Sequence, residues 1–305
     1  MTEPLSIKGP IQAWRVNAFT DMPFTGNPAG VVPDADGLSD QLMLNISGEL
    51  NDISETVFIC RPETKNADLR LRYFTSTTEV DLCGHATVSA LFVLAWLGRI
   101  EGKNETKIIR AETKAGILEL GLTFVEGEPG WAIMEQLAPQ VYPAPGADFA
   151  AEILGLPTSA ISDELEIGCA SSGLWACFVP LKNLTYLQRV KINSPRIQEL
   201  WPENHELTGV YPFVFLNEHV TQGRFFSPPK YGIFEDPVTG TASGALGAYL
   251  LAHNRMPKEG ELLARQGFEM GRGGMVKVSR NTNGKMTIKG QAVVVFRGEI
   301  NLAGC

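Results

Sequence analysis

The sequence predicts an α+β fold in which two similar units each curl a sheet around one buried helix. Three features lead to this prediction: many short strand-like runs, two helices without a charged face, and a stretch of sequence that occurs twice. The strands and helices do not alternate as in a doubly wound fold, and no G-x-G-x-x-G follows a strand. A nucleotide-binding fold of that type is therefore not expected.

The first elements are a strand and a helix. Residues 14–19 alternate between apolar and polar side chains, which is typical of a strand. Ser39 can cap a helix in which the apolar residues Leu42, Ile46 and Leu50 are spaced four apart. This spacing predicts a helix with one face toward a core.

Strand-like runs occupy much of the remaining chain. Residues 56–60 form a β-rich run with Glu55 at its entrance, and residues 69–74 alternate. Seven further runs follow, at 107–111, 117–122, 131–135, 175–181, 210–216, 275–278 and 291–297. Two long apolar helices interrupt this series of predicted strands.

These two helices are predicted at residues 85–98 and 241–253. Neither shows a charged face. A helix that is apolar on all sides must be enclosed by other elements. Each helix is therefore expected to be the centre of one unit.

A short internal repeat supports the two units. Residues 72–75 resemble residues 224–227, and residues 84–87 resemble residues 240–243. The offsets are 224 − 72 = 152 and 240 − 84 = 156, so four residues are inserted between the two matches. The predicted domains are 1–130 and 131–305, and the last strand can cross back into the first. The linker is expected within 126–130 or 138–147.

Composition excludes several classes of protein. The chain has 305 residues and a formal net charge of −8, without a dense basic run, so a nucleic-acid partner is not expected. The longest apolar run, residues 90–97, is too short for a membrane span. The first residues do not resemble a signal peptide. The expected location is the cytoplasm.

The cysteines and histidines do not show the spacing of a disulfide framework or of a metal site. The cysteines at 60, 83, 169, 177 and 305 are odd in number and contain no C-x-x-C pair. This argues against a disulfide framework and a zinc ribbon. No spacing among histidines and cysteines suggests a metal site, so none is predicted.

The starts of the two apolar helices are candidate anion sites. They read Gly84-His85 and Gly240-Thr241. The first N–H groups of a helix have no partner within it, and this end is positive. Glycine lets a ligand approach the backbone closely, so two such ends can hold a carboxylate. The alternative is that these glycines only permit tight packing.

Other side chains near these positions are candidates for chemistry. Glu55 precedes an apolar strand, where a partly desolvated carboxylate suits acid–base work, although on spacing alone a surface residue capping a turn is the simpler interpretation. Asp236 lies four residues before Gly240, and its alternative is a turn residue before a proline. Cys83 precedes a helix start and is a candidate base, whereas its counterpart in the repeat is Thr239.

Five ordered motifs resemble the PhzF-like isomerase family of phenazine biosynthesis. They lie at residues 17–20 (NAFT), 26–29 (GNPA), 54–58 (SETVF), 84–87 (GHAT) and 235–242 (EDPVTGTA). The resemblance implies a fold like that of diaminopimelate epimerase. This fold has two pseudo-symmetric domains, each a mostly antiparallel β-barrel wrapped around one central apolar α-helix, with the active site in the cleft between them. It also implies a homodimer without a metal or organic cofactor.

The resemblance also implies roles for individual residues. Glu55 matches the family's catalytic glutamate, which moves a proton within the substrate. His85, Asp236 and Thr241 match residues that hold the substrate, and Gly84 and Gly240 match positions that offer backbone donors. Where this chain has Thr241, serine is common in the family.

The resulting hypothesis is a cofactor-independent isomerase. It shifts a carbon-bound proton within a small, carboxylate-bearing, cyclic substrate by means of Glu55. One alternative is an amino-acid or hydroxy-acid epimerase or racemase that uses Cys83. Thr239 breaks the two-cysteine pattern of the related epimerases. The other alternative is a non-catalytic protein that binds a small anionic molecule.

Overall fold

The computed structural model describes residues 9–50, 55–144, 146–200, 207–231 and 234–302. The chain forms two compact units: unit 1 comprises residues 1–134 and 290–305, and unit 2 comprises residues 135–289. The chain leaves unit 1 four residues after the boundary expected at 130/131, and its last segment returns to unit 1. Neither stretch expected to hold the linker contains the crossing, because the chain crosses at the end of a strand rather than in a loop.

Unit 1 is mostly sheet. Its strands are β1 (Ile11–Ala18), β2 (Asn27–Val32), β3 (Thr56–Cys60), β4 (Leu69–Phe74), β5 (Glu79–Val80), β6 (Thr106–Thr113), β7 (Gly116–Val125), β8 (Glu128–Glu135) and β19 (Ala292–Ile300). Its helices are α1 (Asp40–Leu50) and α2 (Gly84–Trp96).

Unit 2 contains more helical turns. Its strands are β9 (Gln140–Pro143), β10 (Gly168–Ser171), β11 (Trp175–Pro180), β12 (Gly209–Asn217), β13 (Val220–Gly223), β14 (Phe225–Phe226), β15 (Glu235–Asp236), β16 (Leu262–Gln266), β17 (Gly274–Arg280) and β18 (Met286–Gly290). Its α-helices are α3 (Ala147–Leu154), α4 (Leu184–Arg189) and α5 (Gly240–Ala252), and its 3-10 helices are η1 (Thr158–Ala160), η2 (Ser194–Leu200), η3 (Pro229–Tyr231) and η4 (Phe268–Met270).

The strands of the two units pair in the same succession. In unit 1 the order is β19-β1-β2-β3-β4-β6-β7-β8, and in unit 2 it is β9-β10-β11-β12-β13-β16-β17-β18. In both, the third and fifth pairs are parallel and the other five are antiparallel. The predicted mostly antiparallel character is confirmed, the two parallel pairs in each unit were not predicted, and closure of each sheet into a barrel stays a prediction.

Helix α1 forms where the apolar spacing predicts it. The backbone N–H of Leu42 donates to the Ser39 hydroxyl at 3.3 Å, which is the predicted cap. Met43, Ile46 and Leu50 are buried and share a core cluster with Phe58 of β3. Ile46 and Leu50 of the predicted spacing thus face the core, whereas Leu42 is only partly buried and Met43 is buried instead.

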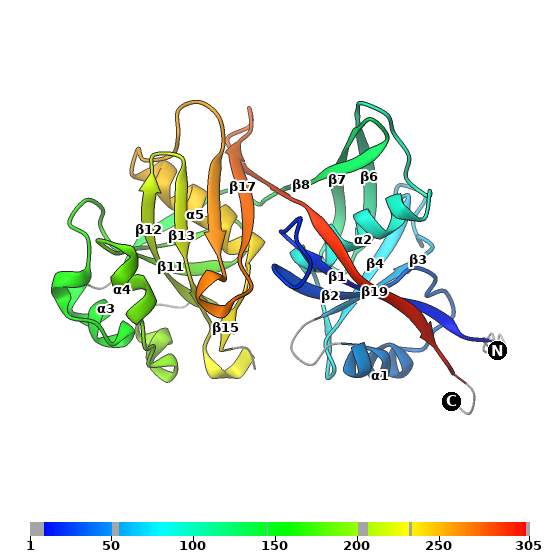
Figure 1. Cartoon of the computed structure of the whole chain (residues 1–305), viewed down its shortest axis with the longest axis horizontal. Coiled ribbons are helices and arrows are strands. Elements are labelled where there is room, and N and C mark those ends of the chain that lie inside the picture. Colours follow the sequence, from blue (N-terminus) through cyan, green and yellow to red (C-terminus); the bar gives the residue numbers. More distant parts are fainter. Residues whose placement is uncertain (1–8, 51–54, 145, 201–206, 232–233, 303–305) are drawn as a thin grey trace. The chain divides into compact units, whose positions relative to one another are not determined.

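Helix α2 is enclosed, as its composition requires. Nine of its 13 residues are buried. It packs against β1, β2, β3 and β19 of unit 1, and Figure 1 shows it in cyan among the strands of this unit. The helix ends at Trp96 rather than at the predicted Gly98, because Gly98 adopts φ 69° and its N–H closes the end of the helix on the Ala95 carbonyl.

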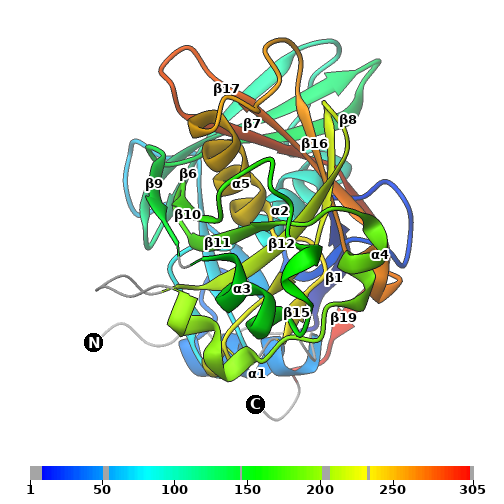
Figure 2. The same ribbon diagram turned by 90° about the vertical axis from the view of Figure 1, so that its left-hand side faces the viewer.

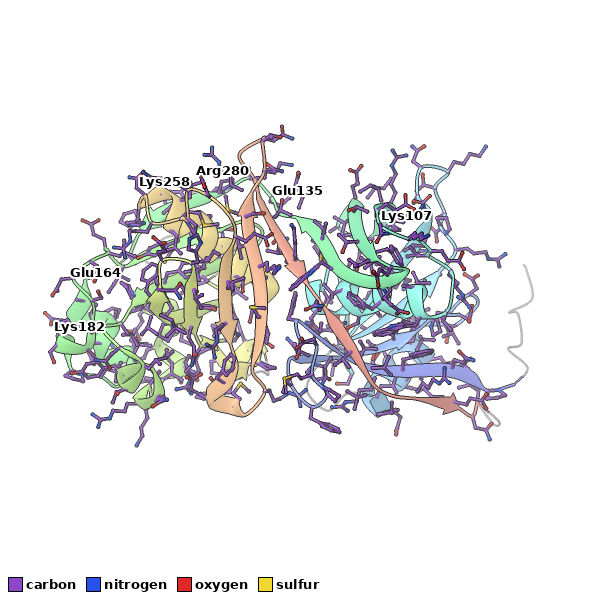
Figure 3. All side chains as sticks on the ribbon, turned by 45° about the horizontal axis from the view of Figure 1, so that its top comes forward. Lys107, Glu135, Glu164, Lys182, Lys258 and Arg280 are labelled. Carbon is purple, nitrogen blue, oxygen red and sulfur yellow. The ribbon has the colours of Figure 1, made fainter. Side chains whose placement is uncertain are left out.

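Helix α5 is the counterpart in unit 2. Ten of its 13 residues are buried, and it packs against β9, β10, β11 and β17 (Figure 2). A Cβ at Gly247 would lie 2.7 Å from Val278 Cγ1, so any other residue here would have to displace the Val278 side chain of β17. Neither α2 nor α5 contains a Lys, Arg, Asp or Glu. By contrast, charged side chains of unit 2 such as Lys182 and Glu164 point outward in Figure 3.

The length and hydropathy of the helices show whether any of them could cross a membrane. Within the described part of the chain, no helix has both the length and the apolar character needed to cross a bilayer.

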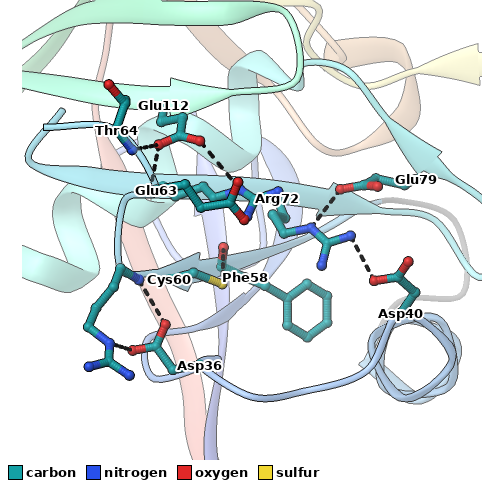
Figure 4. A network of polar contacts seen from close by, with 11 residues as sticks. Asp36, Asp40, Phe58, Cys60, Glu63, Thr64, Arg72, Glu79 and Glu112 are labelled. Atoms are coloured by element: carbon teal, nitrogen blue, oxygen red, sulfur yellow. Dashed lines mark hydrogen bonds and ion pairs between the residues drawn. The ribbon is translucent and has the colours of Figure 1, made fainter. Parts of the chain in front are cut away.

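In unit 1 the repeated sequence forms a strand, a turn and a partly buried ion pair. Arg72 of β4 donates from Nε to the Glu79 carboxylate at 2.8 Å, and Figure 4 shows this contact together with the one to Asp40. Phe74 lies opposite Glu79 in the antiparallel β4–β5 pair. The Arg72 guanidinium lies 5.0 Å from the centre of the Phe74 ring. Helix α2 begins five residues after Glu79.

In unit 2 the same contacts recur. Arg224 donates from Nε to Glu235 at 2.7 Å, Phe226 lies opposite Glu235, and the guanidinium is 4.7 Å from the Phe226 ring centre. Helix α5 begins five residues after Glu235. The connecting loops, residues 75–78 and 227–234, differ by the four residues expected from the offsets. The internal repeat predicted from the sequence is thus confirmed in these contacts.

Candidate active site

The start of α2 presents backbone donors in unit 1. Cys83 precedes the helix in an extended conformation, and its side chain does not cap it. The first main-chain bond within the helix runs from Thr87 N–H to the Cys83 carbonyl at 3.0 Å. The amides of the preceding residues have no partner within the helix, and this end is positive. Among the described residues, nothing lies within 4 Å of a Cβ placed on Gly84, so the backbone there is accessible.

Glu55 lies beside this helix end. Its backbone carbonyl accepts a hydrogen bond from the Gly30 N–H at 3.1 Å. This bond holds the residue before β3 against β2. Its carboxylate Oε2 is 3.4 Å from Nε2 of His85, and the two side chains are 20% and 12% exposed. The arrangement places a partly desolvated carboxylate against the imidazole at the start of α2. Ser54, the preceding residue of the motif, lies outside the described residues.

Cys83 completes the group. Its sulfur lies 3.4 Å from His85 Nδ1 and 3.7 Å from Nε2. One ligand atom from each of Glu55, Cys83 and His85 lies within 4.8 Å of the others. The sequence predicted these residues as separate candidates and predicted no metal ligands. The three-residue group was missed because Glu55 comes from another element, 28 residues before Cys83.

In unit 2, Asp236 lies at the start of α5. The hydroxyl of Thr239, which precedes the helix, donates to the Asp236 carboxylate. Gly240 is buried and Thr241 is half-buried in the first turn. The structure therefore brings Asp236, Gly240 and Thr241 to one helix end in unit 2, as it brings Glu55 and residues 84–85 to one helix end in unit 1.

Gln266 is a residue that the sequence did not predict here. This buried side chain, at the end of β16, donates from Nε2 to the Asp236 carbonyl at 2.7 Å and accepts the Thr239 N–H at 3.2 Å. The next residue, Gly267, has φ 82°, and a Cβ there would overlap the Pro237 carbonyl oxygen. Gln266 and Gly267 thus hold the acidic turn against β16. A single glutamine in a strand gives no sequence signal for this role.

Comparisons with known proteins identify the family. The family model for PhzC-PhzF, described as phenazine biosynthesis-like protein, matches residues 16–298. The chain is 37% identical over 286 residues to the uncharacterized isomerase YfhB of Bacillus subtilis, covering 92% of this chain and 94% of that one. It is 36% identical to the uncharacterized isomerase YddE of Escherichia coli K12, covering 94% and 97%.

A solved structure agrees with this. The Bacillus anthracis phenazine biosynthesis protein of the PhzF family is 36% identical and superposes with a TM-score of 0.83, covering 95% of this chain and 99% of that one. The resemblance inferred from five motifs is thereby confirmed over nearly the whole chain. The chain belongs to the phenazine biosynthesis-like PhzC-PhzF family, and it is an enzyme of the isomerase class.

Proposed function

We propose that the protein is a cofactor-independent isomerase that shifts a carbon-bound proton within a small, carboxylate-bearing, cyclic substrate, with Glu55 as both base and acid. The observation that carries this proposal is the position of the Glu55 carboxylate, 3.4 Å from His85 at the positive end of α2. Both side chains are mostly buried but still reach solvent, as groups that meet a substrate must.

The proton transfer follows from this placement. A proton on carbon leaves slowly unless the charge that develops is stabilised. The amides at the start of α2, which have no partner within the helix, offer donors for a substrate carboxylate or for the developing negative charge. Glu55 removes the proton, holds it as a carboxylic acid, and returns it to another carbon on the same face.

Unit 2 supplies the remaining groups of the proposal. Asp236, Gly240 and Thr241 are proposed to hold the substrate, because they gather at the start of α5 and because the family motif assigns them this role. The Thr239 hydroxyl and the Gln266 amide orient the Asp236 turn. The homodimer and the cytoplasmic location stay predictions.

The test is solvent exchange. The purified protein is incubated in deuterium oxide with a panel of unsaturated cyclic carboxylic acids, and incorporation of deuterium at carbon is followed by NMR. Glu55→Gln is expected to fold normally and to lose exchange by about 10²–10⁴-fold. The control Glu105→Gln, at an exposed position just before β6 of unit 1, is expected to keep the rate. Exchange at the wild-type rate in Glu55→Gln would reject the proposal.

One observation favours a second candidate function. The Cys83 sulfur lies 3.4 Å from His85 Nδ1, so the imidazole can accept the thiol proton and make Cys83 a second base. Inversion at one carbon needs an acid and a base on opposite faces, and in an epimerase Cys83 would be one of the two. Cys83→Ala separates the two: the isomerase keeps its activity and the epimerase loses it. A non-catalytic binding protein is not proposed, because the curated relatives are named isomerases.

A further inference from the structure

Three side chains with metal-ligating atoms converge in unit 1. They are the thiol of Cys83, the imidazole of His85 and the carboxylate of Glu55. Cys83 and His85 flank the start of α2, whereas Glu55 comes from the entrance of β3. Within the part of the chain that the structure describes, this is the one such group of three.

The distances match the edges of a tetrahedral zinc site. Zinc bonds of about 2.3 Å to sulfur and about 2.0–2.1 Å to nitrogen and oxygen, at a tetrahedral angle, separate sulfur and nitrogen by about 3.6 Å and nitrogen and oxygen by about 3.3 Å. In the structure, His85 Nε2 lies 3.7 Å from Cys83 Sγ and 3.4 Å from Glu55 Oε2. Two of the three edges therefore already have the length that the metal requires.

The third edge joins sulfur to the carboxylate. The three ligand atoms lie within 4.8 Å of one another, so this edge exceeds the required length of about 3.6 Å by at most about 1.2 Å, which a rotation of the Glu55 side chain can close. That side chain has three rotatable bonds and is 20% exposed, and such a rotation needs no movement of the backbone.

The donor set selects the class of metal. Thiolate and imidazole prefer Zn²⁺ and similar borderline cations, whereas Mg²⁺ and Ca²⁺ prefer oxygen ligands alone. A thiolate and a carboxylate together neutralise the double charge of the ion. Three protein ligands leave the fourth position to water or to an anionic ligand.

We propose that Glu55, Cys83 and His85 bind one Zn²⁺ ion, and that this ion inhibits the enzyme by occupying Glu55. The binding itself is independent of the proposed function. The inhibition rests on it, because it requires Glu55 to be the catalytic base.

The binding is tested on the full, reduced, metal-free chain with Zn²⁺ alone, by calorimetric titration. One ion per chain is expected. Changing a group that only orients a metal ligand costs about 10–100-fold in affinity, so losing a ligand in Cys83→Ala or His85→Gln should cost at least tenfold. Cobalt gives a second readout, since a thiolate-to-cobalt charge-transfer band is expected in the wild type and not in Cys83→Ala. Mg²⁺ is expected not to bind to this group.

The chain offers matched controls. Cys60→Ala removes another free cysteine of unit 1. His219→Gln removes an imidazole that also lies beside a carboxylate, with Nε2 3.6 Å from Glu218, but on an exposed turn of unit 2. Both variants should bind zinc like the wild type. If Cys83→Ala does not keep the melting temperature of the wild type, Cys83→Ser, which keeps the size and removes the thiolate, takes its place.

The outcomes separate the two proposals. Failure of the wild type to take up Zn²⁺, unchanged affinity in Cys83→Ala or His85→Gln, or an equal loss in Cys60→Ala would overturn the metal site. Reversal of zinc inhibition by a chelator, in the exchange assay, supports the inhibitory role. If zinc binds as expected but Glu55→Gln still exchanges deuterium, the metal site stands and the proposed function fails. If zinc does not bind and Glu55→Gln is inactive, the reverse holds.

Discussion

Replacing Gln266 with methionine keeps the side-chain volume and removes three hydrogen bonds at the start of α5. The amide donates to the Asp236 carbonyl at 2.7 Å and to the Thr239 hydroxyl at 3.2 Å, and it accepts the Thr239 N–H at 3.2 Å. A buried polar group left without a partner costs about 1–3 kcal/mol. Two backbone groups lose their partner, and water can reach part of this turn because Asp236 and Thr239 are half-buried. We therefore expect a loss of about 2–4 kcal/mol.

This loss is measurable in the thermal unfolding of unit 2. For a unit of this size, residues 135–289, each 1 kcal/mol lowers the melting midpoint by about 2–4 °C. Calorimetry should show the unit 2 transition about 4–16 °C lower in Gln266→Met. The control Gln12→Met makes the same change on an exposed position of β1 and should shift the midpoint by less than about 2 °C. A shift this small in Gln266→Met would refute the role assigned to the Gln266 amide.

Three further predictions concern stability and reactivity. Gly267 and Gly271 both have positive φ, but in the described structure a Cβ at Gly267 would overlap backbone atoms whereas a Cβ at Gly271 would enter open space. In urea unfolding, Gly271→Ala should therefore cost about 1–2 kcal/mol and Gly267→Ala should cost more. Equal losses in the two variants would contradict this. A double-mutant cycle of Arg224→Met and Glu235→Met should give a coupling energy of about 1.5–3 kcal/mol, because two charged hydrogen bonds of 2.7 and 2.8 Å join side chains that are each 11% exposed. Additive losses of stability in the double mutant would argue against this coupling. Burial, and next the nearby Asp36 carboxylate, raise the pKa of Cys60 to about 11. The rate of alkylation of Cys60 should therefore rise about tenfold per pH unit from about pH 8 to 10. A rate that levels off below about pH 9 would contradict the raised pKa.

The features that sequence predicts well are those set by neighbouring residues. Helices α2 and α5 follow from long runs without a charge, which can be stable only when enclosed. The repeat follows from two short sequence matches. The structural feature that the two matching segments share is an Arg–Glu ion pair, Arg72–Glu79 in unit 1 and Arg224–Glu235 in unit 2. In both cases the signal can be seen in short stretches of sequence, although strands distant in the chain enclose the helices.

The features that sequence misses depend on strand pairing. Glu55 meets Cys83 and His85 because β3 pairs in parallel with β2, and α2 packs across both strands. Gln266 reaches the Asp236 turn from a strand that is distant in sequence. The crossing between units at residues 134–135 and 289–290 occurs at strand ends, without the Pro- or Gly-rich composition that marks a linker. No local pattern encodes such contacts.

The central claim is that one carboxylate carries the proton from one carbon of the substrate to another. The most direct measurement uses substrate deuterated at the donor carbon, in ordinary water, under single-turnover conditions with the wild-type enzyme. If Glu55 carries the proton, it does so from a side chain that is only 20% exposed, so part of the deuterium should reappear at the acceptor carbon of the product. Product whose new hydrogen comes entirely from water, from the first turnover onward, would contradict the single-carboxylate account.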